Sequence, residues 1–221
     1  LDNGMGIGVS MSLTAAGLVT DVNIDTGMGS IGLGTGQDSA VDAMDGSPAC
    51  YSLNACGSAL NANYNDGDAL SGNSIKYSNS LGGVSFALTR GMEAASVEPV
   101  ISLAASTSIM GATIKAGVSE IDYKAAGTAD VDPSFVTVGY SIAGLNLGYA
   151  MYDGDNGGEE TQMGVGTSAM GMNVGVTFAD ADLATDVDYM RVSLSKGMGA
   201  ASFGLDYTET DVSGTDTGDS D

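Results

Sequence analysis

The sequence has no histidine, no tryptophan and only three prolines. Histidine is the usual base that activates a catalytic nucleophile and a common metal ligand, so its absence removes both of these arrangements. The acidic residues are concentrated in glycine-rich stretches and show no catalytic spacing. We therefore expect that the protein is not an enzyme.

Basic residues are scarce as well. Six Lys and Arg stand against 28 Asp and Glu, which gives a formal net charge of -22. Binding of nucleic acid is excluded, because its phosphates need Lys and Arg to displace their counterions. Such a chain attracts cations instead.

Long apolar runs are also absent. No stretch approaches the roughly 20 apolar residues that a membrane-spanning helix requires. Leucine is scarce, whereas glycine, serine, threonine, valine and tyrosine are plentiful, and this balance favours strands and turns. The sequence therefore predicts an all-β fold.

There are only two cysteines, Cys50 and Cys56, in the segment ACYSLNAC. Their spacing is compatible with a small disulfide-closed loop, which would indicate an oxidising compartment. The alternative is two free thiols. A zinc site is disfavoured, because the sequence has no histidine and no second cysteine pair.

Alternation of apolar and small polar residues is the strongest pattern that is present. From Met5 to Leu13 every odd position is apolar and every even position is Gly or Ser, as in a strand with one apolar face. Nothing else in the chain is apolar enough to form a second layer, so the apolar face must meet something outside the chain, and lipid is the simplest candidate. About thirteen strands are predicted, the further ones around residues 18–24, 31–33, 75–77, 84–88, 100–105, 110–118, 136–142, 145–151, 162–167, 170–178, 187–194 and 203–207.

The links between these strands differ in length. In an outer-membrane barrel, short turns at one end alternate with long loops at the other. Long links, which carry most of the acidic residues, are predicted at 36–72, 91–98, 119–133, 152–161, 179–186 and from 208 onward. Short links are predicted at 24–29, 79–83, 106–108, 141–145, 168–171 and 195–200. The pattern indicates an antiparallel transmembrane β-barrel.

The segment GNSIKYSNSLGGVSFALTRG (72–91) resembles the part of Gram-negative general diffusion porins that follows their constriction loop. Residues 27–44 look like the family strand that enters this loop, and residues 1–13 look like an earlier hairpin. Beyond about residue 90 the resemblance is one of pattern only. It implies a single barrel domain over residues 1–221, with thirteen of sixteen family strands present and both ends of the barrel missing.

The resemblance also implies a site. Residues 37–71 are similar to the family's third loop, which folds inward and narrows the pore, and Lys76 falls where the family places a basic residue facing the lumen. An acidic loop opposite a basic wall gives a transverse field that sets ion preference. Where the family usually has an arginine this chain has Thr35, so the basic wall is thinner. The acidic residues of this loop are Asp38, Asp42, Asp45, Asp66 and Asp68.

The expected function is therefore passive diffusion of ions and small hydrophilic solutes, with a preference for cations. The resemblance implies a homotrimer that is exported through the periplasm to the outer membrane of a Gram-negative bacterium. Its expected partners are membrane lipid, lipopolysaccharide and the solutes, and no cofactor is expected apart from calcium bound in a loop.

Two other interpretations stay open. The first is a secreted, acidic, calcium-binding adhesin, since carboxylates in glycine-rich loops can coordinate calcium, although no nonapeptide repeat is present. The calcium candidates are Asp153, Asp155, Glu159 and Glu160. The second is a non-porin outer-membrane barrel, because only the long segment 37–71 argues for a diffusion pore.

Overall fold

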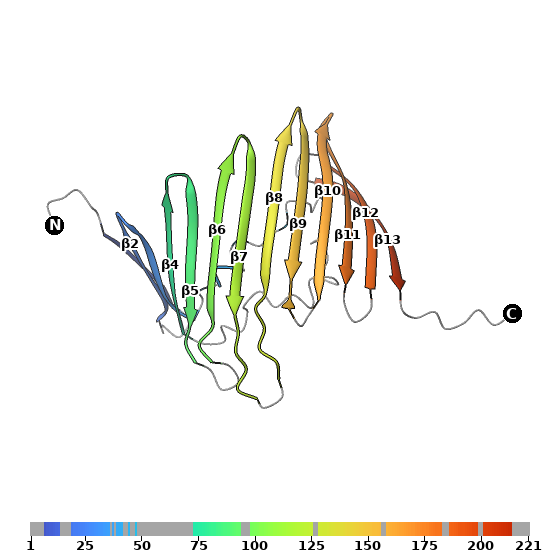
Figure 1. Cartoon of the computed structure of the whole chain (residues 1–221). Coiled ribbons are helices and arrows are strands. Elements are labelled where there is room, and N and C mark those ends of the chain that lie inside the picture. Colours follow the sequence, from blue (N-terminus) through green and yellow to red (C-terminus); the bar gives the residue numbers. More distant parts are fainter. Residues whose placement is uncertain are drawn as a thin grey trace. The chain divides into compact units, whose positions relative to one another are not determined.

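A computed structural model of the chain shows a sheet of thirteen antiparallel strands in sequence order (Figure 1). It describes residues 7–13, 19–35, 37, 39–41, 44, 47, 73–93, 98–125, 128–155, 158–182, 186–198 and 201–213. Within these ranges no helix is long and apolar enough to cross a membrane. The strands are β1 (Gly8–Leu13), β2 (Val19–Thr26), β3 (Gly29–Gly34), β4 (Ser74–Leu81), β5 (Val84–Gly91), β6 (Ile101–Ile109), β7 (Ala112–Glu120), β8 (Ser134–Ile142), β9 (Leu145–Asp153), β10 (Glu159–Ala169), β11 (Met172–Asp182), β12 (Asp186–Met198) and β13 (Ala201–Ser213).

The chain forms two compact units. The first consists of residues 1–46, 65–108 and 115–135, and the second of residues 47–64, 109–114 and 136–221. Strands β1 to β5 lie wholly in the first unit and β9 to β13 wholly in the second. In each unit, short turns join strands at one end, here called the turn end, and longer links leave from the other, the link end (Figure 1).

Several short turns have two successive residues with positive φ. The pairs Gly82–Gly83, Met110–Gly111, Ala143–Gly144 and Met170–Gly171 all show this geometry, with φ between 51° and 85°. It is the type I′ turn, whose twist matches that of the flanking strands. In three of the four pairs a residue with a side chain takes the first left-handed position, which is uncommon outside glycine, asparagine and aspartate.

The turn predicted at residues 106–108 is wrong. Ser106 pairs with Ser85 and Thr107 with Val84, inside the β5–β6 ladder. The chain turns instead at Met110–Gly111, where the left-handed backbone needs the glycine. Small polar residues were taken for a turn, but in this sheet they are ordinary strand residues.

Several strands extend further than their apolar residues indicate. The link predicted at 152–161 is shorter in the structure, because β9 continues to Asp153 and β10 begins at Glu159. Likewise, β11 continues to Asp182 and β13 to Ser213. Glu159 pairs with Asp153 and with Asp182, so the backbone ladder continues beyond the last apolar positions. The predicted strand ends were wrong here because acidic residues were assigned to loops.

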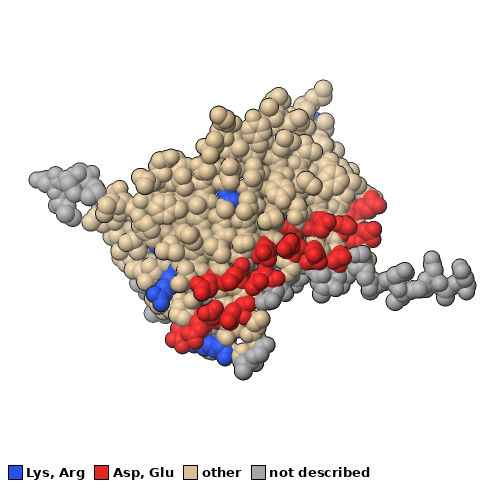
Figure 2. Space-filling model, in the orientation of Figure 1, with Lys and Arg blue, Asp and Glu red and all other residues tan. Residues whose placement is uncertain are grey.

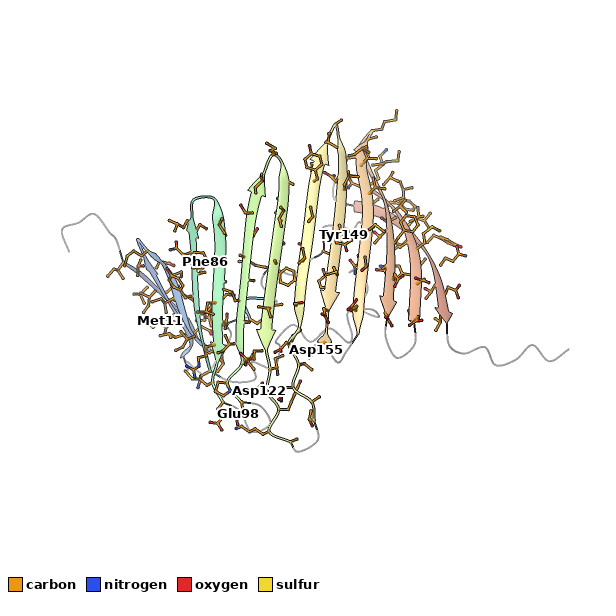
Figure 3. The ribbon with its side chains drawn as sticks, in the orientation of Figure 1. Met11, Phe86, Glu98, Asp122, Tyr149 and Asp155 are labelled. Carbon is orange, nitrogen blue, oxygen red and sulfur yellow. The ribbon has the colours of Figure 1, made fainter. Side chains whose placement is uncertain are left out.

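The faces of the sheet are inverted relative to those of a water-soluble protein. On β5, Val84 and Leu88 are about 40% exposed, whereas Thr89 is completely buried. We call the side of Val84, Phe86 and Leu88, and its counterpart on the other strands, the apolar face, and the opposite side the polar face. Phe86 and Tyr149 are labelled in Figure 3 along their strands. Exposed apolar and buried polar side chains are the arrangement of a sheet whose apolar face meets lipid.

Candidate functional site

Lys76 lies on the polar face of the first unit. It stands between Gly32 on β3 and Thr89 on β5 and is half-buried. Its chain neighbour Ile75 is 41% exposed on the apolar face. Because side chains alternate along β4, the Lys76 side chain lies on the polar face, as the sequence pattern predicts.

Gln37 lies over Gly32, the residue of β3 that pairs with this lysine. A Cβ atom added to Gly32 would lie 2.2 Å from the Gln37 Oε1 atom, so the carboxamide fills the space that the missing side chain leaves. The Gln37 Nε2 atom donates to Asn23 Oδ1 at 3.4 Å and to Asp21 Oδ1 at 3.5 Å. The chain therefore turns back onto the polar face soon after β3 ends.

The next residues cross the same face. Ser39, Ala40 and Val41 are at most 2% exposed. The Ala40 amide donates a hydrogen bond of 2.9 Å to the Ser102 hydroxyl on β6. Because β4 and β5 lie between β3 and β6 in the sheet, this contact carries the segment across the strands of Lys76 and Thr89.

The predicted acidic residues of the loop lie outside the described residues. These are Asp38, Asp42, Asp45, Asp66 and Asp68, together with the cysteines Cys50 and Cys56. The acidic side of the constriction and the disulfide stay predictions, as does the inward course of residues 37–71 as a whole.

The calcium candidates lie on different sides of the sheet. Asp153 and Glu159 are paired across β9 and β10, whereas Glu160 pairs with Tyr152 and points to the polar face. Asp155 follows the end of β9, and its amide donates to Asp153 Oδ1 at 2.8 Å. Within the described ranges, no group of three or more His, Cys, Asp or Glu side chains is placed to hold a metal ion. Calcium binding here stays a prediction.

Acidic side chains gather at the link end of the strands in each unit (Figure 2). Glu98 and Asp122 mark this end in the first unit and Asp155 in the second (Figure 3). Some carboxylates stand directly opposite one another across strands. In the second unit, Asp188 on β12 pairs with Asp180 on β11 and with Asp211 on β13. Like charges at paired positions repel, and they make this end a region of strongly negative potential.

Beyond the strands of the first unit, two links are joined by an ion pair. The Lys124 ammonium donates a hydrogen bond to the Glu93 carboxylate. This hydrogen bond, with the positive charge of Lys124, holds the pKa of Glu93 below its ordinary value of 4.5. Nearby, the Glu98 amide donates to the Asp122 carbonyl at 2.9 Å, so the two links support each other.

Sequence reasoning named Glu160 only as a calcium candidate and did not group it with Gln162 and Tyr189 of the second unit. Glu160, Gln162 and Tyr189 are all buried on the polar face. The available signal was the alternation of Met163 and Val165, which continues back through Thr161 to Glu159 and places Glu160 on the opposite side from Glu159.

Comparisons with known proteins agree with this geometry. The family model described as Gram-negative porin matches residues 1–221. No curated protein matches the chain. Among solved structures, a porin refined at 1.8 Å is 17% identical with a TM-score of 0.63, over 96% of this chain and 88% of that one. A double mutant of a porin from Rh. blastica is 16% identical with a TM-score of 0.61, over 94% of this chain and 80% of that one. At these identities the solved structures show the shared fold.

Proposed function

Since the chain belongs to the Gram-negative porin family, we propose that it forms a water-filled pore for passive diffusion of ions and small hydrophilic solutes and that the pore prefers cations. The polar face lines the pore, and the apolar face meets the lipid of the outer membrane. This assignment favours the porin over the adhesin and over other outer-membrane barrels.

The observation that carries this proposal is the hydrogen bond from Ala40 to Ser102. A chain segment that crosses the polar face narrows any lumen that this face lines. Lys76 lies on a strand that the segment crosses, which supports the proposal that its charge faces the narrowed passage. Selectivity is set where the passage is narrowest, because charges act there at short range.

The cation preference rests on charge. The sequence carries a formal net charge of -22, and carboxylates crowd the link end of the strands. Negative potential at a pore mouth raises the local concentration of cations. Asp38, Asp42, Asp45, Asp66 and Asp68 would extend this field into the constriction opposite Lys76.

We further propose that three copies assemble in the outer membrane, surrounded by lipid and lipopolysaccharide. The exposed apolar side chains of each strand supply the lipid-facing surface. The link end, with the longer connections, faces the cell exterior, and the turn end faces the periplasm.

The test is a planar-bilayer recording of the full chain under a tenfold potassium chloride gradient. We expect large conductance steps in groups of three and a zero-current potential of the sign for cation flow. Lys76→Gln removes the basic charge from the passage and should raise the cation preference further. Lys196→Gln is the matched control, because Lys196 is an exposed residue near the turn end of β12.

Each outcome has a defined meaning. If no conductance is seen, the pore assignment is wrong. Anion preference in the unaltered protein contradicts the proposed selectivity while leaving the pore in place. An equal effect of the two lysine variants would show that Lys76 does not face the constriction.

A further inference from the structure

Three polar side chains converge on the polar face of the second unit. Gln162 on β10 pairs with Ala179 on β11, which pairs with Tyr189 on β12. Glu160 pairs with Ala181 in the neighbouring row. Tyr189 lies in one buried cluster with the two alanines, so its ring packs on β11, the strand next to β10. The two small residues leave room for the phenol to approach the acidic and amide side chains.

All three side chains are almost fully buried. Glu160 is 3% exposed, Gln162 is 2% exposed and Tyr189 is 7% exposed. The Gln162 amide nitrogen donates to one carboxylate oxygen of Glu160. Among the residues that the structure describes, the other oxygen of Glu160, the Gln162 carbonyl oxygen and the Tyr189 hydroxyl have no hydrogen-bond partner. A buried polar atom left unpaired costs about 1–3 kcal/mol, so three such atoms in one place indicate that a partner is missing.

The chemistry of these atoms limits what the partner is. The carboxylate and carboxamide oxygens carry no hydrogen and act only as acceptors, whereas the Tyr189 hydroxyl both donates and accepts. A single partner for all three oxygens therefore offers either positive charge or its own hydrogen-bond donors, and oxygen ligands suit hard cations. The three ligands together carry a single negative charge. The Arg191 guanidinium lies 5.7 Å from the centroid of the Tyr189 ring, and its positive charge disfavours an ion of higher charge.

We propose that Glu160, Gln162 and Tyr189 form a binding site for a partly dehydrated monovalent cation, such as potassium, on the polar face of β10–β12. This site deepens the proposed pore function, and only its role in permeation rests on that function. On a pore-lining wall, such a site holds a permeating cation after it has passed the acidic link end. The binding itself requires only the geometry of the three side chains.

The experiment measures thermal unfolding of the full chain in detergent micelles. Increasing concentrations of potassium chloride are compared with tetramethylammonium chloride at equal ionic strength. Tetramethylammonium screens charge equally, but its methyl groups prevent oxygen ligands from coordinating it. We expect the unfolding midpoint to rise more in potassium than in tetramethylammonium. The potassium concentration that gives half of this potassium-specific rise measures the affinity of the site. In Glu160→Gln this concentration should increase at least about tenfold.

Glu159→Gln is the matched control. It removes one carboxylate from the adjacent residue, whose side chain is exposed on the other face, and should leave the potassium-specific rise unchanged. Tyr189→Phe keeps the ring and removes one ligand oxygen, and should weaken the potassium effect to a smaller degree. It provides a second test if Glu160→Gln does not fold.

Two results would overturn the site. The first is an unfolding midpoint that depends equally on potassium and tetramethylammonium, which would indicate that a water molecule satisfies these oxygens. The second is an equal response of the Glu160 and Glu159 variants. Because the measurement is independent of conduction, a protein that conducts normally without a potassium-specific shift refutes only the site. A protein that shows the shift without conducting refutes only the pore.

Discussion

The Ala40 amide and the Ser102 hydroxyl are joined by a buried hydrogen bond of 2.9 Å between residues 62 positions apart in the chain. It ties the segment after β3 to the strand β6. Ser102 is 1% exposed, and its neighbour on the same face, Ala104, is equally buried. A serine in a row of small residues therefore fixes the position of a segment that begins on the other side of β4 and β5.

Ser102→Ala should loosen this crossing segment. The substitution leaves the buried Ala40 amide without its acceptor, which costs about 1–3 kcal/mol. We expect a lower unfolding midpoint and a larger, noisier single-channel conductance. Ser106→Ala, on the same face of β6 but nearer the turn end, is the control and should change neither quantity. Unchanged conductance in Ser102→Ala would show that the crossing segment does not narrow the passage.

Gly117→Ala should destabilise the first unit. A Cβ atom at Gly117 would lie 2.5 Å from a ring carbon of Phe135 and 3.0 Å from the Ala104 Cβ atom. Overpacking of this kind costs about 1–3 kcal/mol. Gly197→Ala is the control, since no atom of the described part of the chain lies within 4 Å of the added Cβ. Denaturant unfolding in micelles measures the difference, and Phe135→Leu should restore part of the loss if the ring is the obstacle.

Met110→Asn should stabilise the β6–β7 turn. Met110 has a φ of 52° and precedes Gly111, in a turn for which Asn-Gly is the preferred pair. We expect a gain of up to about 1 kcal/mol in the free energy of unfolding, since asparagine tolerates the left-handed region better. Met28→Asn makes the same change at another exposed turn methionine whose φ is not positive, and it should give no gain. Equal effects would trace the gain to polarity rather than to backbone strain.

Asp188→Asn should stabilise the second unit at low ionic strength. Asp188 stands between Asp180 and Asp211. Like charges that face each other across two strands lower stability by roughly 0.2–1 kcal/mol for each pair. Glu209→Gln is the control, because Glu209 pairs with Met190 and should give a smaller gain. In about 1 M salt the Debye length falls to about 3 Å, and the difference should shrink. A salt-independent gain would contradict charge repulsion as the cause.

The Glu93–Lys124 ion pair should give a pH-dependent term in stability. The pKa of Glu93 is lowered in the folded protein by the Lys124 hydrogen bond and charge. The unfolded state therefore binds the proton more tightly, so the contribution is present above pH 4.5 and is lost as the pH falls through the folded value. An NMR titration that follows the carboxyl carbon should give a pKa for Glu93 below 4.5. In Lys124→Met the pKa of Glu93 should return to that value. An unchanged titration in this variant would refute the pairing.

The alternation of residue types was enough to predict the faces of the strands. Met163 and Val165 lie on the apolar face for the same reason as Val84 and Leu88, because side chains along a strand alternate strictly. The number of strands followed from counting these segments. The position of Lys76 on the polar face followed in the same way from its place between Ile75 and Tyr77.

The turns and strand ends were harder to predict. Ser106 and Thr107 are residue types that are common in turns. In this sheet they pair with the neighbouring strand β5 like any other strand residues. Glu159 and Asp182 belong to strands because backbone hydrogen bonds continue where the apolar band has ended. Local composition does not contain this information.

The group of Glu160, Gln162 and Tyr189 could not be predicted, because it depends on register across three strands. Tyr189 lies 27 positions after Gln162, and only the pairing of each with Ala179 places them in one row. A shift of one residue in either ladder would send one of them to the opposite face. Sequence spacing alone does not fix such a register.

The turn end differs from the link end in one more respect. The residues of its turns, Gly82–Gly83, Met110–Gly111, Ala143–Gly144 and Met170–Gly171, carry no charge, and Met110 and Met170 are more than 90% exposed. When a strand pair enters a bilayer, one of its two ends has to pass through hydrocarbon, where an ionised carboxylate is very unfavourable. Only the turn end is free of that penalty. In the proposed orientation the turn end stays on the periplasmic side, so a chain that arrives from the periplasm has to carry its acidic link end across the hydrocarbon, and the carboxylates there make that crossing the costly step of insertion.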